Sequence, residues 1–438
     1  MGVGLTVLRR ARRDPSSALL IGQIVMAATA FVANILAARA LEPSGRGELA
    51  LLLQIAYLCS LGLILGLDRS APAVYNAAPV AVATRGLLRL LLVPSLAGLA
   101  LCLAVISVMD SIWPREGPWR VGLLLAGLFA VVNAFVRATR GIAIATGRQW
   151  QYLRYTFVSQ GLLLILIGVL LINGGGSSTT WMSAYLIAGL VPTVGFLLIW
   201  LRAGTAGDVR ATPLRRAARR EGLLLLPAAM ANSGMLRVDR LLLPVMASTA
   251  ALGVYASVAT MTELLSWPLI SFADARLGVW RAAYDRGQLH VGAALVAAVG
   301  YVVLAGAALG VVIREVVVPL FGEGYRSAPA LVWPLVTAAG VFGIGQVLVS
   351  VLTARRRNGL ASFAEAAGFV VSVVGYVLLI PRAGALGAAY GSLIGYTAGA
   401  LVAAGALLLP GRQMQEALRA EVYVGRPESV PDPAGGVQ

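Results

Sequence analysis

The side chains best suited to chemistry in this chain are charged groups inside an apolar stretch. Residues 222–247 are mostly apolar but contain Asn232, Arg237, Asp239 and Arg240. A charge at the centre of a membrane-spanning helix costs ~2.5–3.5 kcal/mol on insertion scales, so three close together need partners or water. On one continuous helix, the two arginines lie near one face, and Asn232 and Asp239 share another. Such a group either joins helices as a buried charge network or lines a polar cavity, and its net positive charge favours the cavity.

Glu263 adds a carboxylate to the middle of the next apolar stretch. Counted from a hairpin near Ser248 at ~1.5 Å per residue, Arg237 lies about 16 Å deep and Glu263 about 22 Å deep. An extended arginine side chain can bridge that difference. We therefore expect Glu263 either to form a fixed pair with Arg237 or to bind a coupling ion.

Other polar residues inside apolar stretches are weaker candidates. Glu365 either lines the same cavity or sits near the membrane interface. Asn34 and Gln54 face a cavity between two halves of the protein in one interpretation, and bond neighbouring helices in the other. Arg137 lies near the end of its stretch and is expected to extend towards the membrane surface.

The elements that carry these side chains are predicted to be membrane-spanning helices. The chain is 59% hydrophobic and only 12% charged. A stretch of about 19–26 residues forms a helix that crosses the ~30 Å hydrocarbon core. We predict an all-α, polytopic membrane protein with about twelve spans, in two six-helix bundles related by a repeat. The spans are residues 17–40, 48–67, 88–109, 119–138, 155–173, 180–201, 222–247, 250–273, 290–313, 329–353, 360–380 and 384–409.

The arginines predict the orientation. All 35 basic residues are arginines, and 26 of them fall in connections on one side of the predicted spans, against seven on the other. Basic connections stay in the cytoplasm, so both termini and the connection 202–221 are expected there, in the plasma membrane of a bacterium. The net charge of +16 therefore reflects topology, with a secondary role in holding anionic lipid.

The long connection divides the spans into two sets of six. We expect a bundle over residues 1–201, a basic linker over 202–221, a second bundle over 222–410 and a disordered tail over 411–438.

A short similarity relates the two halves. A turn after the first span leads to Gly47 and then Ala50, and a turn after the seventh leads to Gly253 and then Ala256. Each half has six spans and enters the membrane from the same side. This arrangement predicts a parallel repeat about an axis normal to the membrane.

The chain lacks the motifs of common soluble enzymes. It has no phosphate-binding Gly-Lys-Ser/Thr loop, no His-Glu-x-x-His, no Cys-x-x-Cys and no Gly-x-Ser-x-Gly. The two cysteines, Cys59 and Cys102, fall in predicted spans and are expected to pack as small apolar residues. No recognition motif for nucleic acid accompanies the basic residues. We expect no enzymatic activity, no cofactor, no metal and no nucleic-acid partner.

Two groups of residues resemble Wzx-type polysaccharide flippases, of the multidrug/oligosaccharidyl-lipid/polysaccharide exporter superfamily. The first is Gly22-Gln23 with Ala38-Arg39-Ala40-Leu41-Glu42-Pro43 and Gly45-Arg46-Gly47. The second is Asp239-Arg240 with Leu252-Gly253-Val254-Tyr255-Ala256 and Glu263. The resemblance implies two bundles around a cationic cavity. It also implies movement of undecaprenyl-diphosphate-linked sugars from the inner to the outer leaflet by ion-coupled exchange.

What the resemblance implies about the site can be stated residue by residue. Substrate would be held by Arg237 and Arg240 with Asn232, Asn34 and Gln54, since guanidinium groups suit diphosphate or acidic sugars. The acidic residues Asp239, Glu263 and Glu365 would form the ion-coupling or charge network, with a proton or sodium as coupling ion. The partners would be lipid-linked sugar and membrane lipid.

Two other functions remain open. A cation-coupled multidrug exporter of the same superfamily would be favoured by a membrane-embedded acid in the first half, and none is well placed. A membrane-embedded polysaccharide polymerase or ligase needs a large outer catalytic loop, and the outer connections are short. The first span carries no central charge, which disfavours lipid II as the substrate.

Overall fold

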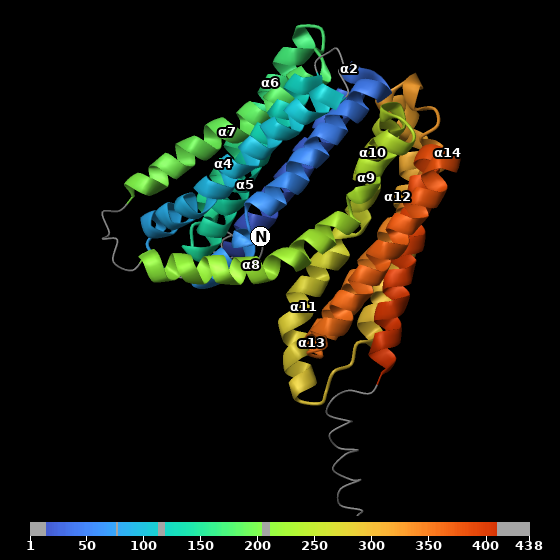
Figure 1. Cartoon of the computed structure of the whole chain (residues 1–438). Helices are drawn as coiled ribbons and strands as arrows, with labels where there is room; N and C mark the ends of the chain where they lie inside the picture. The colour runs from blue at the N-terminus through green and yellow to red at the C-terminus, as the bar shows by residue number, and fades with distance from the viewer. Residues whose placement is uncertain (1–14, 76–77, 113–118, 204–210, 410–438) are drawn as a thin grey trace, which may run out of the picture.

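The described chain is helical throughout. The computed structural model describes residues 15–75, 78–112, 119–203 and 211–409, and within these ranges it contains no strand (Figure 1). Eight helices of this described part are long and apolar enough to cross a membrane. The predicted all-α, multi-pass membrane architecture is therefore confirmed.

The described part of the first half contains six helices, and the longest of them contains two spans. A kink at Glu42, where φ is 57°, divides this helix directly before Pro43, which has no backbone N–H to donate. The elements are α2 (Pro15–Leu63), α3 (Leu67–Val74), α4 (Val80–Ile112), α5 (Trp119–Ala145), α6 (Gln149–Ile172) and α7 (Ser178–Arg202).

The second half contains both broken and kinked helices. Its last helix is divided at Gly384, where φ is 53°. The described residues contain twelve spans if each kinked helix is counted as two, each interrupted pair as one, and the eight-residue α3 is left out. The elements are α8 (Ala211–Met235), α9 (Val238–Met246), α10 (Thr249–Thr262), η2 (Glu263–Leu265), α11 (Trp267–Asp285), α12 (Gly292–Phe321), η3 (Glu323–Tyr325), α13 (Pro329–Ala354) and α14 (Asn358–Leu408).

Two spans expected to be single helices are interrupted. The stretch 222–247 breaks at Leu236 and Arg237, shortly after Gly234, which is a poor helix former. The stretch 250–273 breaks at the 3₁₀ turn η2, and Pro268 in the first turn of α11 has no N–H with which to continue the ladder. These breaks decide where the charged side chains point.

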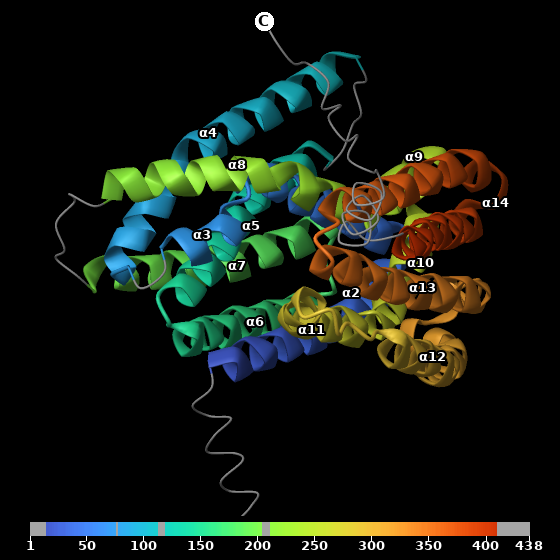
Figure 2. The same ribbon diagram turned by 90° about the horizontal axis from the view of Figure 1, so that it is seen from below.

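Helix α8 begins inside the expected linker and packs on the first half of the chain. Ser70 donates a hydrogen bond to the carbonyl of Ala218 at 3.0 Å. A Cβ on Gly66 would lie 2.2 Å from the carbonyl oxygen of Gly222, so these backbones touch directly. Figures 1 and 2 show α8 running from beside α3 and α4 towards α9 and α14. Residues 204–210 of the linker and the tail 411–438 lie outside the described residues.

The two halves meet at one end, which we call the closed end and define by residues 42–47, 248–253 and 323–325. Figure 1 shows α2 and α10 converging there, while the other ends of the two halves are spread apart. A Cβ on Gly47 would lie 1.8 Å from the carbonyl oxygen of Thr249, and a Cβ on Gly253 would lie 1.9 Å from that of Pro43. The glycines that suggested a repeat therefore pack against each other reciprocally.

Arg39 makes a second contact between the halves beside the closed end. Its Nε donates to the carbonyl of Leu320 at 2.7 Å, and its Nη2 donates to that of Pro319 at 2.9 Å. Both carbonyls belong to the last turn of α12, where a helix presents unpaired acceptors and partial negative charge. A guanidinium from the first half thus caps a helix of the second.

Candidate functional site

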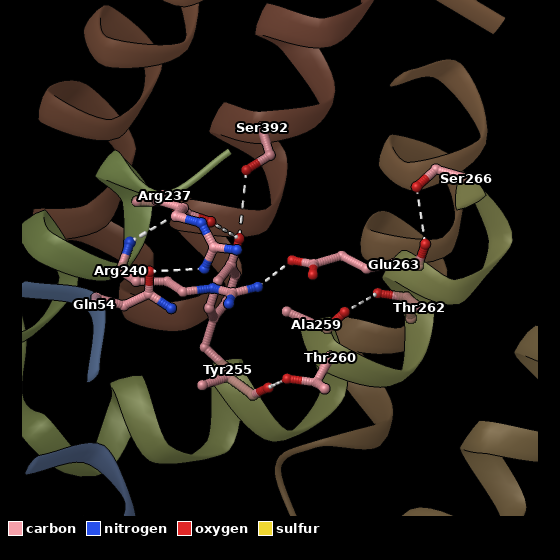
Figure 3. A network of polar contacts seen from close by, with 12 residues as sticks. Gln54, Arg237, Arg240, Tyr255, Ala259, Thr260, Thr262, Glu263, Ser266 and Ser392 are labelled. Atoms are coloured by element: carbon pink, nitrogen blue, oxygen red, sulfur yellow. Dashed lines mark hydrogen bonds and ion pairs between the residues drawn. The ribbon is translucent and has the colours of Figure 1, made fainter. Parts of the chain in front are cut away.

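Arg237 reaches from the second half of the chain into the first. It precedes α9, and its Nη1 donates to Oε1 of Gln54 at 2.9 Å (Figure 3). Its guanidinium carbon lies 3.8 Å from the centroid of the Tyr57 ring, close enough for a cation–π interaction. Gln54 and Arg237, both predicted for the site, are therefore brought together across 183 residues of sequence.

Arg240 points the other way, into the second half. Its side chain is buried and forms an ion pair with Glu263 (Figure 3). The break at residues 236–237 turns the two arginines apart, so the shared helix face expected from their spacing is wrong. Glu263 pairs with Arg240 and not with Arg237.

Asp239 completes a buried network around Arg240. Its Oδ1 accepts the backbone N–H of Arg240 at 2.7 Å, and its Oδ2 accepts the hydroxyl of Tyr255. The Tyr255 hydroxyl also lies 3.4 Å from Oγ of Ser392 in α14. We call these five residues the Arg240 network: Asp239, Arg240, Tyr255, Glu263 and Ser392.

A pocket within the second half gives access to the acids of this network. It encloses about 380 Å³ of empty space that includes open solvent. Asp239, Glu263, Tyr255 and Ser392 line it, opposite Phe342. The side chain of Glu263 remains 35% exposed, so a small ion can reach this carboxylate.

Glu365 lies elsewhere. It lines a second pocket, of about 290 Å³, together with Gln346. Phe342 and Tyr396 line both pockets, and their ring centroids are 5.1 Å apart. Glu365 therefore lies behind an aromatic pair and does not line the pocket of the Arg240 network.

Asn34 serves the contact between the halves. It accepts from Nε and Nη2 of Arg46 at 3.0 and 2.7 Å, and it donates to the carbonyl of Ser257 at 3.4 Å. Arg46 is only 8% exposed, and its Nη1 has no hydrogen-bond partner in the part of the chain that the structure describes. The sequence placed Arg46 in an outer connection, although it belongs to the Gly45-Arg46-Gly47 motif. Asn232 lies on α8, and its side chain is outside the described part of the structure.

Beside Arg237, the sequence missed Tyr57 and Asp68, and it assigned Arg137 to the membrane surface. The guanidinium carbon of Arg137 lies 4.6 Å from the centroid of Tyr57, and its Nη1 lies 3.5 Å from Oδ2 of Asp68. Tyr57 follows Gln54 by three positions and so shares its helix face, a spacing that could have identified it. We call this group the Tyr57 site: Gln54, Tyr57, Asp68, Arg137 and Arg237.

The Tyr57 site carries net positive charge, because it contains two arginines and one carboxylate. Among the described residues, Arg237 forms no ion pair with a carboxylate; it contacts the amide of Gln54 and the ring of Tyr57, and the charges of Glu263 and Arg240 act on it from beyond ion-pair distance. The Nη1 of Arg137 lies 3.5 Å from Oδ2 of Asp68, which is longer than the ~2.7–2.9 Å of a strong charge-assisted hydrogen bond. The described residues also contain no cluster of three or more histidine, cysteine or acidic side chains that could hold a metal ion.

The comparisons with known proteins identify the fold. No family model and no curated protein sequence matches the chain. The chain is similar to the inward-facing conformation of a multidrug resistance MATE family transporter of the MOP superfamily, with a TM-score of 0.70 and 16% identity over 91% of this chain and 96% of that one.

Two further structures have the same architecture. The lipid II flippase MurJ, in an inward closed conformation, matches with a TM-score of 0.68 and 11% identity over 94% of this chain and 90% of that one. A MOP superfamily transporter from Pyrococcus furiosus matches with a TM-score of 0.59 and 17% identity over 93% and 98%. The chain has the twelve-helix fold of MOP-superfamily transporters, and these similar structures are transporters rather than enzymes.

Proposed function

We propose that this protein is a transporter that moves undecaprenyl-diphosphate-linked oligosaccharide from the inner to the outer leaflet of a bacterial plasma membrane. The observation that carries the proposal is the guanidinium of Arg237, which Gln54 and Tyr57 hold between the two halves and which has no ion-paired carboxylate among the described residues. A cation without a carboxylate partner is costly inside a membrane protein unless an anion visits it. A diphosphate is such an anion, and it suits the planar donor fork of arginine.

The proposed movement uses the two halves as alternating gates. The halves expected over residues 1–201 and 222–410 would close on each other in turn at opposite membrane surfaces, with both termini in the cytoplasm. The reciprocal glycine contact at the closed end supports an outer gate in this scheme. Asp239 and Glu263, which line a solvent-open pocket, are the proposed ion-coupling residues, with a proton or sodium as the ion.

A cation-coupled multidrug exporter is the second candidate, favoured by the likeness to a MATE family transporter. The charge of the Tyr57 site opposes it. Arg137 and Arg237 both lie against Tyr57, and they would repel a cationic drug. Binding of an anionic lipid diphosphate or of a cationic dye therefore separates the two candidates.

The test is flipping of a fluorescent undecaprenyl-diphosphate sugar by purified protein in vesicles. Arg237→Ala should abolish flipping, and Arg237→Lys should restore part of it, because the charge returns without the two-pronged geometry. Arg276→Ala is the matched control, since Arg276 is exposed and its cation–π contact is with Phe272. Normal flipping by Arg237→Ala at normal abundance would remove the basis of the proposal.

A further inference from the structure

Two guanidinium groups from opposite halves of the chain share one aromatic ring. Arg137 comes from α5 and Arg237 precedes α9, and their guanidinium carbons lie 4.6 and 3.8 Å from the centroid of Tyr57. The two carbons are therefore at most 8.4 Å apart, the sum of these two distances. The face of the tyrosine ring attracts both cations, but the cations repel each other. An anion that contacts both would remove this repulsion.

The charge on Arg137 is only loosely compensated. Its contact with Asp68 is 3.5 Å long, and the side chains of Arg137 and Asp68 are 21% and 24% exposed. The Nε of Arg137 is buried and has no hydrogen-bond partner within the described ranges. At 3.5 Å the contact is longer than the ~2.7–2.9 Å of a strong charge-assisted hydrogen bond, so an anion that approaches Arg137 more closely can replace Asp68.

The Arg240 network provides the contrast. Arg240 is 5% exposed, it is paired with Glu263, and Asp239 accepts its backbone N–H. An anion that enters between the halves would have to break a buried pair to reach Arg240. Arg137 and Arg237 are only partly buried, and no such buried pair has to break before an anion contacts them.

From these contacts we infer that Arg137 and Arg237 bind the two phosphoryl groups of one diphosphate, and that Asp68 is a resident counter-anion which the diphosphate displaces. A diphosphate presents two phosphoryl groups joined through one oxygen, each of which can accept from one guanidinium. A bound diphosphate would connect α5 of the first half to α9 of the second, away from the closed end. This inference rests on the proposed function, because it names the part of the substrate that the site holds.

Replacing Asp68 tests the inference, because a structural role and a competing role predict opposite changes in ligand affinity. If Asp68 only supports the fold, Asp68→Asn should weaken ligand binding or leave it unchanged. If Asp68 competes with the ligand for Arg137, Asp68→Asn should tighten binding. The amide keeps the shape of the carboxylate and removes its charge.

The experiment is calorimetric titration of the full-length protein in nanodiscs with undecaprenyl diphosphate, and with undecaprenyl monophosphate as the second probe. We expect Asp68→Asn to lower the dissociation constant for the diphosphate about three- to tenfold. Arg137→Gln should raise it at least tenfold and should remove the preference for diphosphate over monophosphate. Arg276→Ala should match the wild type.

The double variant Arg137→Gln with Asp68→Asn shows whether the effect of Asp68→Asn on binding requires Arg137 or reflects a change in folding. With Arg137 gone, nothing remains for Asp68 to compete for, so the double variant should bind as Arg137→Gln does. Two results would overturn this inference and leave the proposed function standing. One is that Asp68→Asn binds the diphosphate no more tightly than wild type. The other is that Arg137→Gln binds it as wild type does while Arg237→Ala does not. Wild-type protein that binds neither probe overturns both.

Discussion

Gly253 and Gly47 allow the closest approach of the two halves, and replacing either by alanine should open the closed end. A Cβ on Gly253 would lie 1.9 Å from the carbonyl oxygen of Pro43. Real Cβ contacts do not fall below 3.0 Å, so α10 and α2 must separate by at least about 1.1 Å. The atom it meets is backbone, which cannot move aside as a flexible side chain can.

Overpacking of this kind costs about 1–3 kcal/mol. Because every 1.4 kcal/mol is a factor of ten in an equilibrium constant, the balance between closed and open ends should shift about 5- to 150-fold towards open. Gly62→Ala is the matched control. Gly62 lies on the same helix as Gly47, and a Cβ there meets nothing within 4 Å.

The assay is labelling of a buried cysteine by a membrane-impermeant maleimide. Ser257→Cys, in protein that also carries Cys59→Ala and Cys102→Ala, places the reporter at a residue with 0% exposure beside the closed end. Gly253→Ala should raise its labelling rate by the factor above, and Gly62→Ala should not. A second reporter, Thr139→Cys, is also at 0% exposure but lies within α5, and it should stay unlabelled unless the protein unfolds. Equal, slow labelling of Ser257→Cys in both glycine variants would refute the glycine contact as a gate.

Two further predictions concern coupling and topology. Glu263→Gln leaves the buried Arg240 without its ion pair. If the pair is a fixed structural one, the variant should be less stable to heat and less abundant. The loss in free energy of unfolding should be smaller than the roughly 3–5 kcal/mol of a fully buried pair, because Glu263 is 35% exposed. A coupling site instead predicts a folded variant that binds lipid-linked sugar but whose transport ignores an imposed proton or sodium gradient, so full abundance with an unchanged gradient response would contradict both. For topology, an impermeant thiol reagent on intact cells should label Ser177→Cys and not Thr205→Cys; the reverse pattern would invert the predicted orientation.

The sequence located the charged residues more reliably than it located their partners. Its span pattern put Arg237, Arg240 and Glu263 inside the membrane, because unbroken apolar stretches on both sides leave no other place for them. It also selected Gln54, which accepts from Arg237. The prediction that Glu263 pairs with Arg237 assumed one straight helix through Leu236. The helix breaks there, and Glu263 pairs with Arg240 instead.

Two arginines were misplaced for different reasons. Arg46 was assigned to an outer connection between two spans. The helix resumes directly after the kink at Glu42, so Arg46 is helical and its side chain donates to Asn34. Arg137 was assigned to the membrane surface because its position in its own span suggested it. Its contact with Tyr57 depends on how α5 packs against α2, and spacing along one helix contains no information about that.

What the sequence determined by itself is the set of spans, and with it the fold class. In a membrane each span satisfies its backbone hydrogen bonds within itself, so apolar length and local charge are sufficient to identify it. The tertiary structure decided which charges meet, because Arg237 and Gln54 are 183 residues apart and their contact exists only once the two halves have packed. The same holds for Gly47 and Gly253: the sequence marked both as related positions, and only the packing of α2 on α10 made them touch.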